Sequence, residues 1–145
     1  MSDASTAEKR DKEGYAEVSS EQLNLWGGII LDAAITVHKE LGAGLLESAY
    51  ELALSRELFL RGFNVNTQVP VELYYKEVSL GKAYAIDILI NNEIIIEVKS
   101  VDIMHPVFQA QIITYLKLYN RRLGYLINFN VPLLKDGFKR IVNNI

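Results

Sequence analysis

The sequence contains no cysteine among its 145 residues. It can therefore hold no disulfide framework, no thiolate nucleophile, and no zinc or iron–sulfur site built on cysteine. The N-terminal stretch has no apolar h-region, and no later apolar run reaches the roughly 18 residues that a membrane span requires. We therefore expect a cytoplasmic protein with no membrane partner.

An excess of positive charge is also lacking: 15 lysines and arginines face 18 acids, for a net charge of −3 at pH 7. Contact with nucleic acid would thus need a local basic patch or a bound metal. Apolar residues, at 50%, are plentiful enough for a folded core. The length supplies one such core but not two, so we predict a single domain over residues 19–145 behind a flexible tail over residues 1–18.

The apolar periodicity predicts a mixed chain with the order ααβββαββ, of the α/β (α+β) class. Ser19 or Ser20 can cap the first helix, which Gly42 and Gly44 end. Pro70 places the first strand near a sheet edge or a strand start. The expected helices cover residues 19–41, 45–62 and 106–120, and the expected strands 69–75, 82–90, 93–100, 123–129 and 137–143.

The second and third strands form a hairpin that carries three charges. Glu97 and Lys99 are two residues apart and so share one face of their strand. Asp87 joins that face only if the loop has three residues, 91–93, because a two-residue loop would turn it to the other face. In the three-residue register the charged face carries Ala85, Asp87, Leu89, Ile95, Glu97 and Lys99, and the opposite face is wholly apolar: Ile86, Ile88, Ile90, Ile94, Ile96 and Val98.

Two carboxylates opposed on adjacent strands repel each other unless a cation lies between them. Lys99 supplies part of that charge, and a divalent metal such as Mg²⁺, which prefers oxygen ligands, would supply more. A lysine beside the metal can orient the attacking water or stabilise the charge that develops on phosphorus. The pattern therefore favours a phosphodiesterase site, and the crowding predicts a raised pKa for at least one of the acids. The alternative is a solvated face with Asp87 simply exposed.

Three motifs together resemble one family. Asp87 followed by "EVK" at 97–99 is similar to the signature of the PD-(D/E)XK nuclease superfamily. "GLLESAY", residues 44–50, matches the pattern that names its GxxExxY group, and "QIITY", residues 111–115, matches the Q-x-x-x-Y of nucleases that resemble the RecB nuclease domain. The resemblance covers roughly residues 20–142 and implies a central mixed sheet flanked by helices, with a metal-dependent nuclease site.

The resemblance also implies roles for individual residues. Asp87, Glu97 and Glu47 would bind Mg²⁺ or Mn²⁺, and Lys99 and Gln111 would complete the catalytic set. For Glu47 the alternative is a solvated acid in the first turn of a helix. For Gln111 and Tyr115 the alternative is an ordinary amphipathic helix with a half-buried tyrosine.

A basic region near the C-terminus is the best candidate for contact with a phosphate backbone. With Tyr115 it comprises Lys117, Arg121, Arg122, Lys135, Lys139 and Arg140, although part of it is equally explained as solvated surface. His38 and His105 lack metal-ligand spacing and are expected to be structural.

The function expected from these residues is metal-dependent hydrolysis of phosphodiester bonds in nucleic acid, DNA in preference to RNA, by a metal-activated water. One alternative is a catalytically inactive member that acts as a nucleic-acid-binding or assembly subunit. A second is a small-molecule or nucleotide-processing enzyme on the same scaffold. Homodimer formation is left open.

Overall fold

The computed structural model describes residues 17–143. The expected flexible tail, residues 1–18, lies outside this range except for Glu17 and Val18, and residues 144 and 145 of the expected domain also lie outside it. Val18 packs against the core. The boundary expected at residue 18 was therefore placed too late in the sequence.

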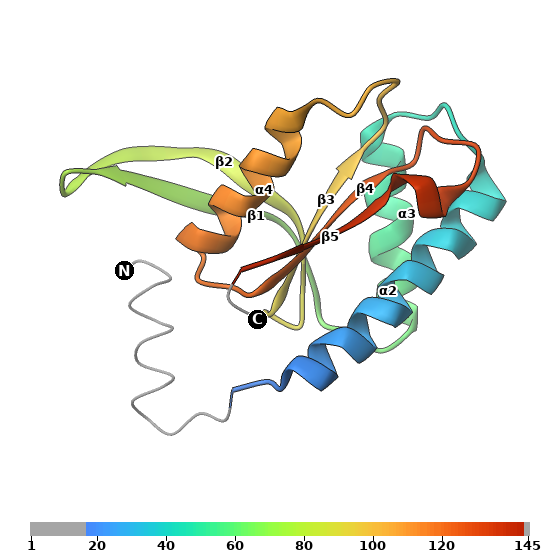
Figure 1. Ribbon diagram of the computed structural model, residues 1–145, viewed down its shortest axis with the longest axis horizontal. Coiled ribbons are helices and arrows are strands. Elements are labelled where there is room, and N and C mark those ends of the chain that lie inside the picture. The colour runs from blue at the N-terminus through green and yellow to red at the C-terminus, as the bar shows by residue number, and fades with distance from the viewer. Residues whose placement is uncertain (1–16, 144–145) are drawn as a thin grey trace.

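The order of helices and strands is the expected one (Figure 1). The elements are α2 (Ser20–Leu41), α3 (Glu47–Leu60), β1 (Val65–Tyr75), β2 (Val78–Ile90), β3 (Ile94–Lys99), α4 (Pro106–Leu118), β4 (Leu123–Asn128), the 3₁₀ turn η1 (Leu134–Gly137) and β5 (Phe138–Val142). The strands lie in the sheet in chain order, with β3 and β4 parallel and all other pairs antiparallel. The mixed α+β class and the order ααβββαββ are confirmed, and within residues 17–143 only η1 was not foreseen.

Capping residues set both ends of helix α2. The Ser19 side chain accepts a hydrogen bond from the backbone N–H of Gln22 at 3.0 Å, and Gly42 ends the helix with a φ of 72°. Within α2 the backbone comes very close to the sheet at Gly27, where an added Cβ would lie 1.8 Å from the hydroxyl of Tyr125. No helix in residues 17–143 is both long and apolar enough to cross a bilayer.

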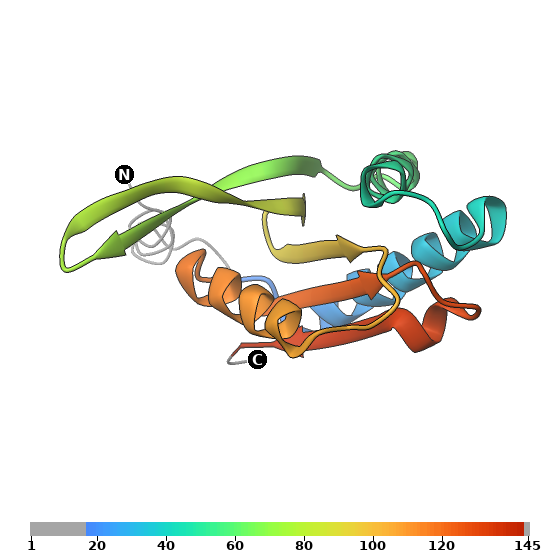
Figure 2. The ribbon, with the colours of Figure 1, turned by 90° about the horizontal axis from the view of Figure 1, so that it is seen from above.

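The helices cover both faces of the sheet (Figure 2). Side chains of α2 and α3 pack on one face with Ile88, Ile96 and Val98, and side chains of α4 pack on the other with Leu89 and Ile95. One expected position is wrong: Ile86 packs with the α4 cluster, although alternation placed it with Ile88. The β1–β2 pairing skips Gln68 and Asp87, and Gln68 has a φ of 49°, so the regular alternation of faces is interrupted between Ile88 and Ile86.

Strands β1 and β2 are longer than expected and extend as an arm beyond the sheet (Figure 1). The chain reverses between β1 and β2 at Lys76 and Glu77, which have φ values of 47° and 71°. Gly81 lies inside β2 next to a register shift. Pro70 lies on β1, the edge strand of the sheet, as expected.

The β2–β3 hairpin has the three-residue loop that the charged pattern required. Ile90 pairs with Ile94 and Ile88 with Ile96, while Asn91 and Asn92 take φ values of 51° and 55°. The ladder stops at Ile88–Ile96. The next two residues along this register are Asp87 and Glu97, so the acids face each other where the strands separate.

Candidate active site

The site lies at the fork where β2 and β3 separate. The backbone N–H of Asp87 donates to Oε2 of Glu97 at 2.8 Å, and the backbone N–H of Val98 donates to Oδ2 of Asp87 at 2.9 Å. Each carboxylate thus takes the place of a ladder hydrogen bond on the opposite strand. This crossed pair holds the two strands apart by a fixed amount and fixes the direction of both acids.

Burial and like charge act together on the acid pair. Glu97 is only 4% exposed, and burial followed by the charge of Asp87 raises its pKa to about 8. Burial also raises the pKa of Asp87, against the lowering effects of the Val98 N–H, Lys99 and Gln68. The predicted rise is present, with burial rather than crowding as its larger cause.

Lys99 stands beside these acids and is supported from α4. Its ammonium lies 4.5 Å from the centre of the Phe108 ring, a cation–π contact. Its positive charge lowers the pKa of both Asp87 and Glu97. The structure thus places Lys99 within electrostatic reach of both Asp87 and Glu97, and the catalytic role of the three residues stays a prediction.

The GxxExxY residues shape the loop between α2 and α3. Gly44 adopts a φ of 96°, and the Tyr50 hydroxyl donates to the carbonyl of Gly42 at 2.5 Å while it accepts from the N–H of Leu45 at 3.1 Å. The Tyr50 ring stacks on Phe129 with centroids 4.5 Å apart. The motif tyrosine therefore anchors the loop in the core just before α3 begins.

The same loop places Glu47 at the first position of α3, where it faces the end of β3. Its Oε2 accepts the backbone N–H of Ser100 at 3.4 Å, and its charge raises the pKa of Asp87 slightly. A pocket of about 280 Å³ lies between α3 and the fork, lined by Glu47, Ser48, Glu51, Gln68 and Asp87.

Three members of this pocket, Ser48, Glu51 and Gln68, were missed by sequence reasoning. Glu51 lies one turn after Glu47, and burial together with the charge of Asp87 raises its pKa. That i, i+4 spacing was a signal that could have been used. Gln68 joins Glu51 to Asp87 through its amide, at 2.7 and 3.3 Å. It reaches them because its backbone has a φ of 49° within β1, a feature with no sequence signal.

Helix α4 brings Gln111 and Tyr115 to the other side of the fork. The amide of Gln111 donates to the Tyr115 hydroxyl at 3.0 Å. Burial, then the charges of Glu97 and Asp87, raise the pKa of Tyr115 to about 12. Tyr115 therefore lies within electrostatic reach of both acids, and Gln111 is hydrogen-bonded to it.

The basic residues do not form one continuous track. Arg121 is 5% exposed, and its guanidinium donates to the carbonyl of Asn92 at 2.6 Å and to the carbonyl of Tyr119 at 2.8 Å. It holds the β2–β3 loop in place, so its expected role in a basic surface is wrong: its donors face the protein interior. Arg122 donates to the carbonyl of Val18.

The remaining basic side chains are exposed but dispersed. Lys117 lies in the last turn of α4, and Lys135 lies in η1. Lys139 and Arg140 lie on β5, the edge strand opposite β1, where Arg140 donates to Asn24 at 2.8 Å. Both histidines have structural partners, since His38 bonds to Val131 at 2.8 Å and His105 caps α4.

The carboxylate oxygens at the fork are the kind of ligand that a hard cation such as Mg²⁺ prefers. Each carboxylate of the crossed pair uses one oxygen, Oδ2 of Asp87 or Oε2 of Glu97, to accept a backbone N–H. The second oxygen of Asp87, Oδ1, accepts the longer hydrogen bond from the Gln68 amide, at 3.3 Å. Mg²⁺ is commonly held by one or two carboxylates, with water and substrate phosphate completing its shell. Among residues 17–143, no three His, Cys, Asp or Glu side chains stand at metal-binding spacing. The role of Glu47 as a third metal ligand stays a prediction.

Comparison with known proteins agrees with this geometry. A family model described as the PD-(D/E)XK nuclease superfamily matches residues 24–141, a range that contains every site residue discussed above. Neither a search of curated proteins nor a search of solved structures found a match. The family match covers most of the chain and includes the acid pair and the lysine at the fork of β2 and β3. The chain therefore belongs to the PD-(D/E)XK nuclease superfamily.

Proposed function

We propose that this protein is a Mg²⁺- or Mn²⁺-dependent nuclease that hydrolyses phosphodiester bonds, with DNA preferred to RNA. The observation that carries the proposal is the crossed pair of a half-buried Asp87 and a buried Glu97 at the strand fork, beside Lys99. A pKa of about 8 for Glu97 makes the pair costly to the fold, because above the ordinary pKa of a carboxyl the unfolded chain ionises more readily than the folded protein and stability is lost. A bound cation removes that penalty.

The side chains at the fork divide the work of such a reaction. Asp87 and Glu97 would hold the ion, which supplies an acidified water and polarises the phosphoryl oxygens. Lys99, held over Phe108, is placed to donate a hydrogen bond and positive charge to a phosphate oxygen as negative charge develops there. Glu47 and Glu51 line the neighbouring pocket, where they can orient water.

We also propose membership of the GxxExxY group, on the match at Gly44, Glu47 and Tyr50 and on the loop that these residues build. Homodimer formation and a cytoplasmic location stay predictions.

The test is a cleavage assay on end-labelled single- and double-stranded DNA and RNA in Mg²⁺, in Mn²⁺ and in EDTA. The wild type should cut in the presence of metal only. Lys99→Ala should lower the rate by about 10²–10³-fold, the typical loss when one donor to a developing oxyanion is removed. Lys39→Ala is the matched control, because Lys39 is an exposed lysine in the last turn of α2.

Cleavage that is unaffected by Lys99→Ala, or that persists in EDTA, would contradict the proposed mechanism. Binding of nucleic acid without cleavage in any metal would instead favour an inactive binding subunit. Cleavage of free nucleotides alone would favour a nucleotide-processing enzyme.

A further inference from the structure

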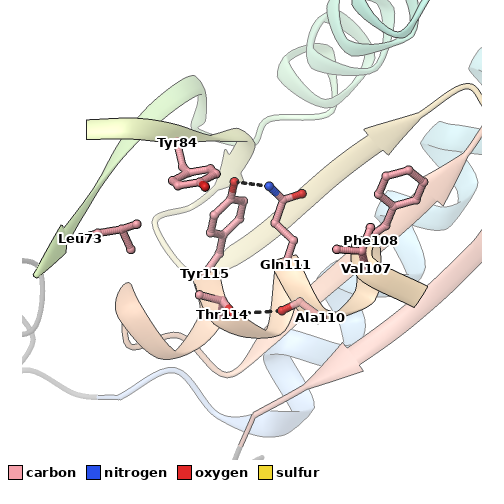
Figure 3. A pocket seen from close by; sticks show the side chains of 8 residues that line it. All are labelled: Leu73, Tyr84, Val107, Phe108, Ala110, Gln111, Thr114 and Tyr115. Carbon is pink, nitrogen blue, oxygen red and sulfur yellow. Dashed lines mark hydrogen bonds between the residues drawn. The ribbon is translucent and has the colours of Figure 1, made fainter. Parts of the chain in front are cut away.

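A second pocket lies between the β1–β2 arm and α4, next to the fork (Figure 3). Its volume is about 460 Å³, within the range of about 300–1,000 Å³ that is usual for small-ligand sites. None of the side chains that line it is charged. Those that bear on its chemistry are Leu73, Tyr84, Phe108, Gln111, Thr114 and Tyr115. A neutral ligand suits this lining better than a phosphate does.

The walls of the pocket are aromatic on both sides. Tyr84 comes from β2 and is 45% exposed, and its ring lies 6.4 Å from that of Tyr115 on α4. Phe108 lies toward the start of α4 (Figure 3). Flat rings on opposing elements provide surfaces on which a planar heterocycle can stack.

The pocket also offers a matched donor and acceptor. The Gln111 amide N–H is committed to the Tyr115 hydroxyl at 3.0 Å, which leaves the Gln111 carbonyl to accept and the Tyr115 proton to donate (Figure 3). The Thr114 hydroxyl is already committed to the carbonyl of Ala110 at 3.0 Å. An adjacent donor and acceptor suit the edge of a nucleobase, which carries both kinds of group. An aliphatic side chain would leave both unpaired.

The pocket and the acid pair share side chains. Phe108 lines the pocket, and its ring also makes the cation–π contact with Lys99, whose ammonium lies 4.5 Å from the ring centre. Tyr115 lines the pocket and lies within electrostatic reach of Glu97 and Asp87. A phosphate at Lys99 would therefore have the pocket beside it, at the place where the base of the same strand can turn in.

We infer that this pocket binds one unpaired nucleobase next to the phosphate to be cut, with Tyr84 as the stacking residue and Gln111 as the hydrogen-bonding residue. The inference rests on the proposed function for the position of the phosphate. It narrows the substrate class, because a base inside a duplex is stacked and paired and cannot enter such a pocket without being turned out. The preferred substrate is thus single-stranded or locally unpaired nucleic acid.

The test measures binding of a fluorescent single-stranded oligonucleotide, and of its duplex, to the full-length protein in EDTA. Tyr84→Ala should weaken binding of the single strand by about 5- to 150-fold, the range expected when one base–aromatic stack is lost. Tyr74→Ala is the matched control, since Tyr74 is also on the arm, is 51% exposed and lies outside the pocket. Gln111→Ala should weaken binding in the same direction.

An oligonucleotide with a single abasic position separates loss of stacking from damage to the protein. The wild type in Mg²⁺ or Mn²⁺ should cleave the phosphate next to the missing base more slowly than the same phosphate in the intact strand. Tyr84→Ala should show no further loss there, because base and ring belong to one interaction and their effects are not additive. Equal loss by Tyr84→Ala on intact and abasic strands would overturn the inference.

The two proposals fail separately. Tyr84-dependent binding of single strands without cleavage in any metal would support the pocket and overturn the nuclease. Metal-dependent cleavage in which Tyr84→Ala behaves like Tyr74→Ala, or in which duplex is cut as fast as single strand, would support the nuclease and overturn the pocket.

Discussion

Replacement of Glu97 by glutamine should make the metal-free protein more stable, by an amount that grows with pH. The side chain keeps its shape, and its amide oxygen can still accept the N–H of Asp87 that Oε2 accepts now, at 2.8 Å. What the substitution removes is the ionisation of a 4% exposed carboxyl. The substitution also removes the repulsion between Glu97 and Asp87.

The pH dependence follows from the pKa of Glu97, which is about 8 in the folded protein against an ordinary value of 4.5. Between these values the folded protein keeps a proton that the unfolded chain releases. The stability of the wild type should therefore fall by about 1.4 kcal/mol per pH unit from below pH 5 and level off above pH 8. The full difference amounts to roughly 5 kcal/mol, a large fraction of the 5–15 kcal/mol that usually holds a domain together.

The assay is urea unfolding in EDTA at pH 4, 6, 8 and 9 for the wild type, Glu97→Gln and Glu40→Gln. Glu97→Gln should match the wild type at pH 4 and exceed it increasingly up to pH 8. Glu40→Gln is the matched control, because it removes an exposed carboxyl at the end of α2. A difference between wild type and Glu97→Gln that stays constant from pH 4 to 9 would refute the reasoning, since Glu97 would then hold no extra proton.

Three further outcomes follow. In thermal unfolding, millimolar Mg²⁺ or Mn²⁺ should raise the wild-type Tm, and more at pH 8.5 than at pH 6.5. At a hundredfold excess of metal over its Kd, the free energy of unfolding should rise by about 2.7 kcal/mol. Asp87→Asn should abolish this response. Arg121→Lys should lose about 3 kcal/mol in urea unfolding, because buried carbonyls lose their donors, while cleavage per folded molecule stays unchanged. Gly27→Ala should lose about 1–3 kcal/mol by overlap with Tyr125, whereas Gly28→Ala, whose Cβ meets nothing within 4 Å, should gain up to about 1 kcal/mol in the same measurement.

Local sequence was enough to predict the elements and the central pair of the site. The residue types at the two ends of α2, the capping Ser19 and the glycine at position 42, mark these ends in the sequence, so the bounds of α2 were predicted almost to the residue. The opposition of Asp87 and Glu97 followed from loop length and the two-residue period of a strand, both of which are local properties. The family motifs pointed to the same residues.

Tertiary structure decided the surroundings of that pair. Gln68 reaches Asp87 only because β1 takes a positive φ opposite the fork, and Arg121 became a buried support only because its side chain meets the loop at Asn92, twenty-nine residues earlier. Ile86 packs in the α4 core because the pairing of β1 and β2 is interrupted at Gln68 and Asp87, which no local pattern signals. The raised pKa of Glu97 likewise depends mainly on burial by residues distant in sequence. Periodicity tells which side chains share a face of one element, but the packing of separate elements determines which of them are removed from water and what they then contact.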